Sequence, residues 1–328
     1  MPNKKILFLL LLALVGFWIA PRVREGYRRR MGPVPEPHRQ TQTGTGYDEG
    51  VTVTLLDRGR VVRLTLREYL CGVLCAELPA DFPEEVWKAQ AVAARSYALY
   101  KTEHPTENHP GAALCTDYTC CTGFRWEEEL RPVWNSGGQT LRNLAEGAAA
   151  ATDGVVAVYE GAVIGAVWHS ASAPYTASAA QVWGGEVAYL QQAESPGGED
   201  SPSYHGVTRI PAEQLRRILL EGLPGAMLGP DPETWITDLT RSRGGYVVTA
   251  LAAGVPVRGS TLRALLELPS AAFTVERAGS DLIFTTVGTG HGVGMSQYGA
   301  ARLARTGSRW DQILTHYYKD IKLLKKTE

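Results

Sequence analysis

An amphipathic segment at residues 66–78 constrains the fold more than any other, because its apolar stripe ends on an acid. The stripe recurs at i, i+4, i+7, i+8 and i+11, which is the spacing of one face of an α-helix. Its members are Leu66, Leu70, Val73, Leu74 and Glu77. Pro79 disfavours helical geometry at Leu78, so the helix is predicted to end there. Glu77 would therefore point toward whatever the leucines pack against.

The position of Glu77 at the end of this stripe predicts acid chemistry. Burial and the negative end of the helix dipole both disfavour the ionised carboxylate, so we expect its pKa to be raised. A carboxylic acid that is still protonated near neutral pH is what a general acid for glycosidic cleavage requires. The alternative is a stripe that frays at its end and leaves Glu77 in water.

The balance of charge argues against one class of partner. The 328 residues include 33 Lys and Arg against 34 Asp and Glu, for a net charge of −1 and a pI of about 6.7. Domains that bind nucleic acid carry a clustered basic excess, so we expect no nucleic-acid partner. Fourteen Tyr and eight Trp against six Phe suit a carbohydrate-facing groove, although core packing explains such rings equally well.

The first 21 residues are predicted to be a membrane anchor. Lys4 and Lys5 precede an uninterrupted apolar run over residues 6–20, which is short for a full span and long enough for a signal-peptide core. No small-x-small cleavage site follows, so we expect an uncleaved, single-pass signal anchor in the cell membrane. The basic cluster after Pro21 argues against a cytoplasmic N-terminus. A short leading helix with a tiny N-terminus nevertheless usually inserts with that N-terminus in the cytoplasm, and we expect this orientation. The body of the chain would then lie outside the cytoplasm.

The rest of the chain is predicted to be a linker followed by one folded region. Residues 22–50 are predicted to be a flexible linker, because Pro, Gly, Thr and Gln dominate their second half. Residues 51–320 mix strands and helices without regular βαβ alternation, which predicts an α+β fold of helices and antiparallel strands around a substrate groove. Residues of about 205–280 are predicted to form an inserted second subdomain. The last eight residues, 321–328, form a basic tail.

A second helix, predicted over residues 82–101, carries two cations on one face. Lys88 and Arg95 are seven residues apart, with the small residues Ala91 and Val92 between them. Two cations that frame small residues can hold polar groups of a substrate. The alternative is an ordinary solvated helix face.

The cysteines fall into two groups. Cys71 and Cys75 lie one turn apart on the Glu77 helix, where bridging geometry is poor. His109, Cys115 and Cys121 recur at intervals of six residues in a loop, with Cys120 adjacent. Two thiolates and an imidazole suit Zn²⁺, whose fourth position is open to water, Cys120 or another residue. A disulfide from Cys115, or free thiols, are the alternatives.

Several ordered blocks of this chain resemble the stage II sporulation protein D family, which includes the related amidase enhancer proteins. The blocks lie within residues 51–320, and the two longest are very specific. They are Glu68–Val73, Ala76–Pro79, Lys88–Tyr97, the His109/Cys115/Cys121 spacing, Trp168–Ser170, Gly290–Ala300 and His316–Tyr318. An anchor followed by a linker is also similar to that family.

The resemblance implies a lytic transglycosylase that cuts peptidoglycan glycan strands stripped of stem peptides and leaves 1,6-anhydromuramyl ends. It implies that Glu77 is the single catalytic acid/base. It also implies a zinc site at His109, Cys115 and Cys121, and we expect that zinc to be structural or groove-shaping. The chain departs from the family at Ala173-Pro174, where a Gly-Gly pair is usual, so contacts made by that loop are less certain.

Six side chains are candidates for sugar contacts. They are Lys88, Arg95, His169, His291, Gln297 and Tyr298. His291 is favoured among them because its glycine neighbours let a substrate approach, while a lone histidine is more often structural. The companion proteins of the family, stage II sporulation proteins P and M, would be partners in the mother-cell membrane during engulfment. The intermembrane space between mother cell and forespore would be the site of action.

Two other functions remain open from the sequence. One is a zinc-dependent cell-wall hydrolase that uses an open position on the metal. The other is a non-catalytic module that binds peptidoglycan or activates a separate amidase, as the amidase enhancer branch suggests.

Overall fold

The side chain of Thr65 caps the start of the helix that was predicted over residues 66–78. In the computed structural model, helix α3 (Leu66–Glu77) begins with a capping box: the Thr65 hydroxyl accepts from Glu68 N at 3.1 Å, and the Glu68 carboxylate accepts from Thr65 N at 2.7 Å. The helix ends at Glu77 because Leu78 is extended (φ −112°, ψ 133°), as Pro79 requires. All four apolar members of the predicted stripe are fully buried. The predicted helix is confirmed.

The structure describes residues 46–132 and 137–327, which belong to one compact unit over residues 43–328. The predicted anchor (residues 1–21) lies outside the described residues, as does most of the predicted linker (22–50), and both stay predictions. Among the described helices, none combines the length and the apolar character that a membrane crossing needs.

The predicted linker is too long at its C-terminal end. Residues Tyr47–Gly50 form the short helix α2, whose first amides, Tyr47 N and Asp48 N, each donate to the Asp153 carboxylate at 2.9 Å. Asp48 is 1% exposed and pairs with Arg95 in the core. The folded region therefore begins before residue 51, because its core needs this aspartate.

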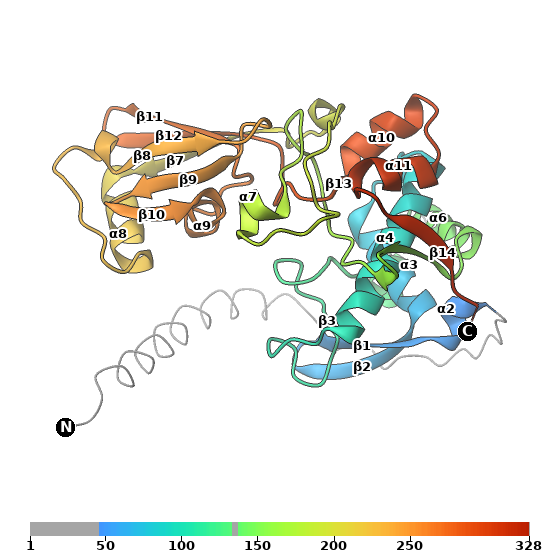
Figure 1. Ribbon diagram of the computed structural model, residues 1–328. Helices are drawn as coiled ribbons and strands as arrows, with labels where there is room; N and C mark the ends of the chain where they lie inside the picture. The colour runs from blue at the N-terminus through green and yellow to red at the C-terminus, as the bar shows by residue number, and fades with distance from the viewer. Residues whose placement is uncertain (1–45, 133–136, 328) are drawn as a thin grey trace, which may run out of the picture. The chain divides into compact units, whose positions relative to one another are not determined.

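Helix α4 (Glu84–Glu103) is the central element of the N-terminal part (Figure 1). It packs against α3, against α6 (Gly138–Ala151) and against α11 (Trp310–Tyr317). Its alanines, among them Ala89, Ala91, Ala93 and Ala94, are fully buried, so neighbouring elements approach its backbone closely.

Two small sheets flank these helices. Strands β1 (Thr52–Asp57) and β2 (Arg60–Thr65) form the predicted hairpin, and β3 (Leu114–Cys115) pairs with β1 in parallel. Strand β4 (Val155–Tyr159) lies between β5 (Ala162–Val163) and β14 (Lys322–Lys325). The predicted basic tail is thus partly an edge strand, because Lys322–Lys325 pair with β4.

A second hydrophobic cluster draws all its buried members from residues 210–284, within and just beyond the predicted subdomain of about 205–280. One sheet has the order β11–β12–β7 and the other has the order β10–β9–β8. Leu215, Leu219, Leu262 and Phe284 are fully buried between these sheets and their two helices. The elements are β7 (His205–Pro211), α8 (Ala212–Gly222), β8 (Ile236–Arg241), β9 (Val247–Ala252), β10 (Val255–Arg258), α9 (Gly259–Leu265), β11 (Phe273–Ala278) and β12 (Asp281–Val287).

Shorter elements connect this second cluster to the helices and sheets around α4. Strands β6 (Trp168–His169) and β13 (Met295–Ser296) form a parallel pair, and β13 leads directly into α10 (Gln297–Arg305). The remaining elements are α5 (Glu127–Leu130), α7 (Ala179–Trp183) and the 3₁₀ turns Gly198–Asp200 and Pro232–Thr234. Helices and mostly antiparallel sheets make up the described chain, which confirms the α+β class.

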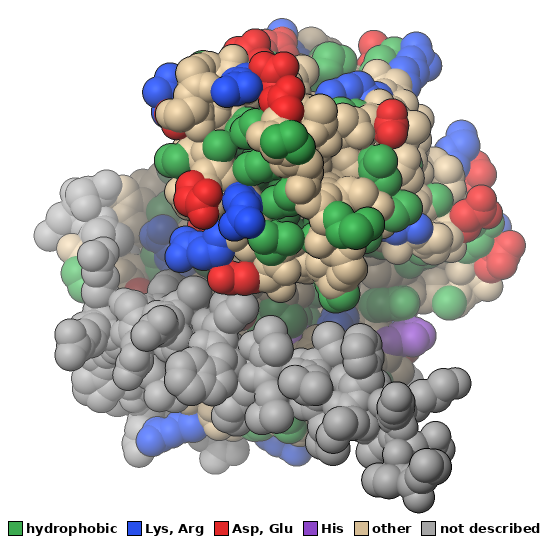
Figure 2. Space-filling model, turned by 90° about the vertical axis from the view of Figure 1, so that its left-hand side faces the viewer, with side chains coloured by type: hydrophobic (Ala, Val, Ile, Leu, Met, Phe, Trp, Pro, Cys, Tyr) green, Lys and Arg blue, Asp and Glu red, His purple; other side chains and the backbone are tan. Residues whose placement is uncertain are grey.

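Charges are mixed on the face that Figure 2 presents. Acidic and basic side chains alternate there with hydrophobic ones, and neither sign forms a continuous patch. The described part of this face therefore shows no basic stripe of the kind that attracts a polyanion.

Candidate active site and metal-binding loop

The Glu77 carboxylate is held by donors from three distant parts of the chain. Its Oε1 accepts from the backbone amide of Gly123 at 2.8 Å. Its Oε2 accepts from the Trp168 indole Nε1 at 3.0 Å and from Gln297 Nε2 at 3.1 Å. The side chain is half-buried, so neither sequence-based alternative holds: Glu77 does not lie among the leucines, and it is not free in water. Instead, the polar donors of Gly123, Trp168 and Gln297 surround the carboxylate and form the Glu77 cage.

Glycine residues let the loop that carries Gly123 lie directly on helix α3. A Cβ at residue 123 would come within 2.9 Å of Glu77 Oε1, so any larger residue would displace the carboxylate. Gly72 of α3 similarly leaves room for the ring of Phe124, and Arg125 N donates to Gly72 O at 3.1 Å. The close approach of the two backbones therefore depends on both glycines.

The other two donors arrive through the parallel pair β6–β13. Trp168 lies opposite Met295 in this pair, and Gln297 is the first residue of the helix that follows β13. The Ser296 hydroxyl caps that helix by accepting from Gly299 N at 3.2 Å. The Trp168 indole packs edge-on against Tyr97 with ring centroids 5.8 Å apart. Both donors are thus fixed by secondary structure.

The three donors differ in what they can do when Glu77 changes its protonation state. The backbone amide of Gly123 and the indole of Trp168 can only donate, which suits an ionised carboxylate. The side-chain amide of Gln297 carries both a donor and an acceptor, and a half-turn exchanges them. Gln297 can therefore bond to Glu77 in its ionised form and in its protonated form.

Two of the predicted sugar contacts, His169 and His291, are neighbours in the structure, and His169 directly follows Trp168 in the chain. His169 is 4% exposed, its Nδ1 donates to Val293 O at 3.1 Å, and its ring lies 5.6 Å from that of His291. Desolvation lowers the pKa of His169 to about 3, with a smaller contribution from His291. Desolvation lowers the pKa of His291 to about 4, with a smaller contribution from Arg263. Both rings are therefore neutral at neutral pH.

Tyr298 follows Gln297 and lies at the same helix start. Its ring packs edge-on against Phe82, with centroids 5.0 Å apart, and its amide donates to Ser170 O at 3.0 Å. The ring is half-buried, which leaves part of it open to a ligand beside the Glu77 cage.

The two predicted cations do not share one environment. Arg95 is 0% exposed; its Nε donates to Asp48 Oδ1 at 2.7 Å and its Nη1 to Val155 O at 3.0 Å. It is therefore part of the core and has no surface that a sugar can touch, which corrects the prediction. Lys88 is 19% exposed and pairs with Glu84 and Glu85 at 2.8 and 2.9 Å.

Sequence reasoning singled out Gln297, as a sugar contact, and named neither of the other two donors to Glu77. Trp168 stands in one of the blocks on which the family resemblance rests, but nothing in the sequence indicated that its indole would be a donor. Gly123 is a backbone donor, for which the only local signal is a glycine just after the cysteine loop.

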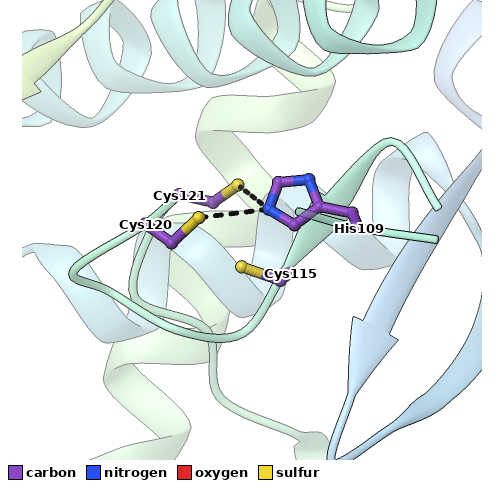
Figure 3. A group of neighbouring side chains, drawn as sticks. All are labelled: His109, Cys115, Cys120 and Cys121. Atoms are coloured by element: carbon purple, nitrogen blue, oxygen red, sulfur yellow. Dashed lines mark hydrogen bonds between the residues drawn. The ribbon is translucent and has the colours of Figure 1, made fainter. Parts of the chain in front are cut away.

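His109, Cys115, Cys120 and Cys121 converge on one point (Figure 3). Their ligand atoms all lie within 4.8 Å of one another, and His109 Nε2 lies 3.1 Å from Cys120 Sγ and 3.5 Å from Cys121 Sγ. A tetrahedral metal with metal–sulfur bonds of about 2.3 Å keeps its sulfur atoms about 3.8 Å apart. The group therefore fits a metal ion, and Cys120 supplies a fourth donor beyond the three predicted.

The candidate metal-binding group and the Glu77 cage share one loop. Cys121 is two residues before Gly123, whose amide bonds to Glu77. Thr122 between them is 5% exposed, and its hydroxyl lies 3.3 Å from the Tyr69 hydroxyl of helix α3. A ligand bound by the cysteines would therefore fix the loop that orients the carboxylate.

Comparison with known proteins places these features in context. The family model described as "Stage II sporulation protein" matches residues 57–159. Stage II sporulation protein D of Bacillus subtilis (strain 168) is 32% identical over 261 residues, which cover 79% of this chain and 74% of that protein. The protein of the same name from Bacillus amyloliquefaciens is 33% identical over 264 residues, or 80% of this chain and 74% of that protein.

A more distant similarity links the chain to a second kind of protein. The amidase enhancer of Bacillus subtilis (strain 168) is 25% identical over 298 residues, which cover 76% of this chain and 39% of that protein.

Proposed function

This chain belongs to the stage II sporulation protein D family, and we propose that it is a lytic transglycosylase that cuts peptidoglycan glycan strands stripped of their stem peptides. The observation that carries this proposal is the carboxylate of Glu77, oriented by Gly123, Trp168 and Gln297. Family membership by itself supports a role at the cell wall.

A lone carboxylate suits this reaction better than hydrolysis. Glycosidases that hydrolyse usually need two carboxylates, one as acid and one to activate water or form a covalent intermediate. In the described part of the chain, the hydrogen-bond partners of Glu77 are an amide nitrogen, an indole and a carboxamide. A transglycosylase uses the C6 hydroxyl of the muramyl residue as its own nucleophile, and such intramolecular attack can replace about 7–11 kcal/mol of positioning free energy.

Glu77 carries one proton through the reaction. As the acid, it protonates the glycosidic oxygen while the bond from that oxygen to the muramyl anomeric carbon breaks. As the resulting carboxylate, it then accepts the proton of the C6 hydroxyl while that oxygen bonds to the anomeric carbon, which closes the 1,6-anhydro ring. Glu77 ends protonated, and the Gln297 amide can hold both forms.

The bound metal is proposed to be Zn²⁺ in a structural role. Three sulfur donors and one imidazole nitrogen match the donor set of structural zinc sites, and four protein ligands leave no open position for water. This donor count argues against the alternative of a zinc-dependent hydrolase. When bound, the ion supplies rigidity to the loop between His109 and Gly123.

The setting proposed for this reaction follows the family. Residues 1–21 would anchor the chain in the membrane, with the catalytic region outside the cytoplasm, between mother cell and forespore during engulfment. Stage II sporulation proteins P and M would be its partners in the membrane. The similarity to an amidase enhancer favours one second candidate, a non-catalytic module that binds peptidoglycan or activates a separate amidase.

Mass spectrometry of the products from purified denuded glycan strands tests the proposal. The wild-type protein should release fragments with 1,6-anhydromuramyl ends, and Glu77→Gln should release none. Glu221→Gln, which changes an exposed glutamate on helix α8, is the matched control and should keep full activity. Reducing ends in place of anhydro ends would indicate a hydrolase, and no cleavage by wild-type protein would favour the non-catalytic candidate.

A further inference from the structure

Trp183 keeps about half of its surface in solvent. It is the last residue of helix α7, and its side chain is 48% exposed. Gly184 and Gly185 follow it, both exposed, and nothing lies within 4 Å of where a side chain at Gly185 would begin. The two residues that follow Trp183 therefore carry no side chain that could cover the indole.

The backbone around Trp183 is fixed although the ring is open. Ser260 Oγ donates to Val182 O at 2.6 Å, and Arg258 Nη1 donates to Ala180 O at 3.4 Å. The Ser178 hydroxyl caps the start of the helix by accepting from Gln181 N at 3.3 Å. An exposed ring on a held backbone loses little conformational entropy when a ligand packs on it.

The Trp183 ring also connects to the Glu77 cage. It packs against His291 with centroids 5.4 Å apart, and the His291 ring is hydrogen-bonded to the backbone of Trp168. Trp168 is the residue whose indole donates to Glu77. The His291 side chain thus lies between the exposed ring of Trp183 and strand β6, which carries Trp168.

A cation lies beside the residue that follows this ring. The Arg258 guanidinium packs against Gly184, in the space that a side chain at residue 184 would take. Arg258 is exposed, and it forms no ion pair with any acidic side chain that the structure describes. The surface at the end of helix α7 therefore offers a flat apolar ring and, close to it, a positive charge.

We propose that Trp183 and Arg258 form a subsite for a muramyl residue of the glycan strand, with the sugar ring stacked on the indole and the lactyl carboxylate paired with the guanidinium. The inference rests on the proposed function. The C–H face of a pyranose packs well on an aromatic ring, and guanidinium suits carboxylate geometry. The lactyl group is a free carboxylate only after the stem peptide has been removed, since the peptide is joined to it as an amide. The subsite would therefore select denuded strands.

Binding measurements on a protein that cannot turn over its ligand test the subsite. The full chain with Glu77→Gln serves as parent, and isothermal titration compares denuded glycan fragments with chitin oligosaccharides, which lack the lactyl group. Adding Trp183→Ala should weaken binding of both ligands about tenfold, and Trp183→Phe should weaken it less. Adding Arg258→Gln should weaken only the denuded fragments, about two- to fivefold as for an exposed ion pair.

Control variants separate this role from a structural one. Arg258→Lys keeps the charge and should retain the preference for denuded fragments, and Arg217→Gln removes an exposed arginine from helix α8 and should change neither affinity. An affinity in Trp183→Ala equal to that of the parent, or equal losses for both ligands in Arg258→Gln, would overturn the inference, as would a parent that binds neither ligand. Correct binding with no anhydro products from wild-type protein would refute only the proposed reaction.

Discussion

The amide nitrogen of Gly123 lies 2.8 Å from Oε1 of Glu77, across 46 residues of sequence. The position that a Cβ would take at residue 123 lies 2.9 Å from the same oxygen. A single loop residue therefore sets both the hydrogen bond and the room available to the proposed catalytic acid.

Replacing Gly123 with alanine should reduce activity without unfolding the protein. The added methyl group must displace either the carboxylate or the loop, and a misplacement of about 1 Å at a reacting group can lower the rate about 100-fold. Release of anhydro products measures the effect. Gly147→Ala, in helix α6 with nothing within 4 Å, is the control and should leave activity unchanged. Normal activity in Gly123→Ala would mean that this contact does not orient the acid.

The donors on Oε2 should contribute to turnover more than to binding. Trp168→Phe keeps an aromatic ring against Tyr97 but removes the indole N–H, and Gln297→Leu removes the amide at nearly constant size. Loss of one donor to a reacting group typically costs about 100-fold in kcat. Steady-state kinetics should therefore give a lower kcat with KM nearly unchanged. A rise in KM alone would assign Gln297 to sugar binding, as first predicted from the sequence.

Removal of the metal should stop the reaction only by loosening the fold. A structural ion held by His109, Cys115, Cys120 and Cys121 stabilises the loop up to Gly123. Chelation should lower the melting temperature and the activity in parallel, and elemental analysis should find one metal ion per chain. Cys120→Ser should weaken metal binding, whereas Cys71→Ser, away from this group, should not. Immediate loss of activity at an unchanged melting temperature would support a metal hydrolase instead.

Stability should fall as the pH falls below the normal histidine range. His169 and His291 have folded pKa values of about 3 and about 4, against 6.5 for an unperturbed histidine side chain. Between these values the unfolded chain binds more protons than the folded one, so stability rises with pH and is lost as pH falls from 6.5 toward 4. The slope should approach about 1.4 kcal/mol per pH unit for each histidine. Urea unfolding at pH 7 and pH 5 measures it, and His169→Gln should flatten it.

The Arg95–Asp48 pair should be essential to stability, in contrast to Lys88. Removing one partner of a buried ion pair leaves an uncompensated charge and costs about 3–5 kcal/mol, so Asp48→Asn should strongly destabilise the protein in urea unfolding. Lys88→Ala removes only surface pairs, which contribute about 0–1 kcal/mol. Similar losses for both variants would contradict the assignment of Arg95 to the core.

Local features of this chain were predictable and distant contacts were not. The spacing of the leucines and Pro79 located helix α3 and its end at Glu77, and the cysteine spacing brought three of the four metal-binding side chains together. The cage around Glu77 depends on the pairing of two-residue strands β6 and β13, which have no periodic signal. The sequence places Arg95 among the sugar contacts and not in the core, because its partner, Asp48, stands in a stretch whose composition resembles a linker.

The donors that orient Glu77 come from residues 46, 91 and 220 positions away along the chain. A nascent or locally unfolded molecule carries the glutamate but has none of these neighbours in place. For the proposed lytic activity, the ability to cut wall polymer would arrive only with completed folding and vanish when the tertiary structure is lost. Misfolded copies would then leave the wall polymer uncut.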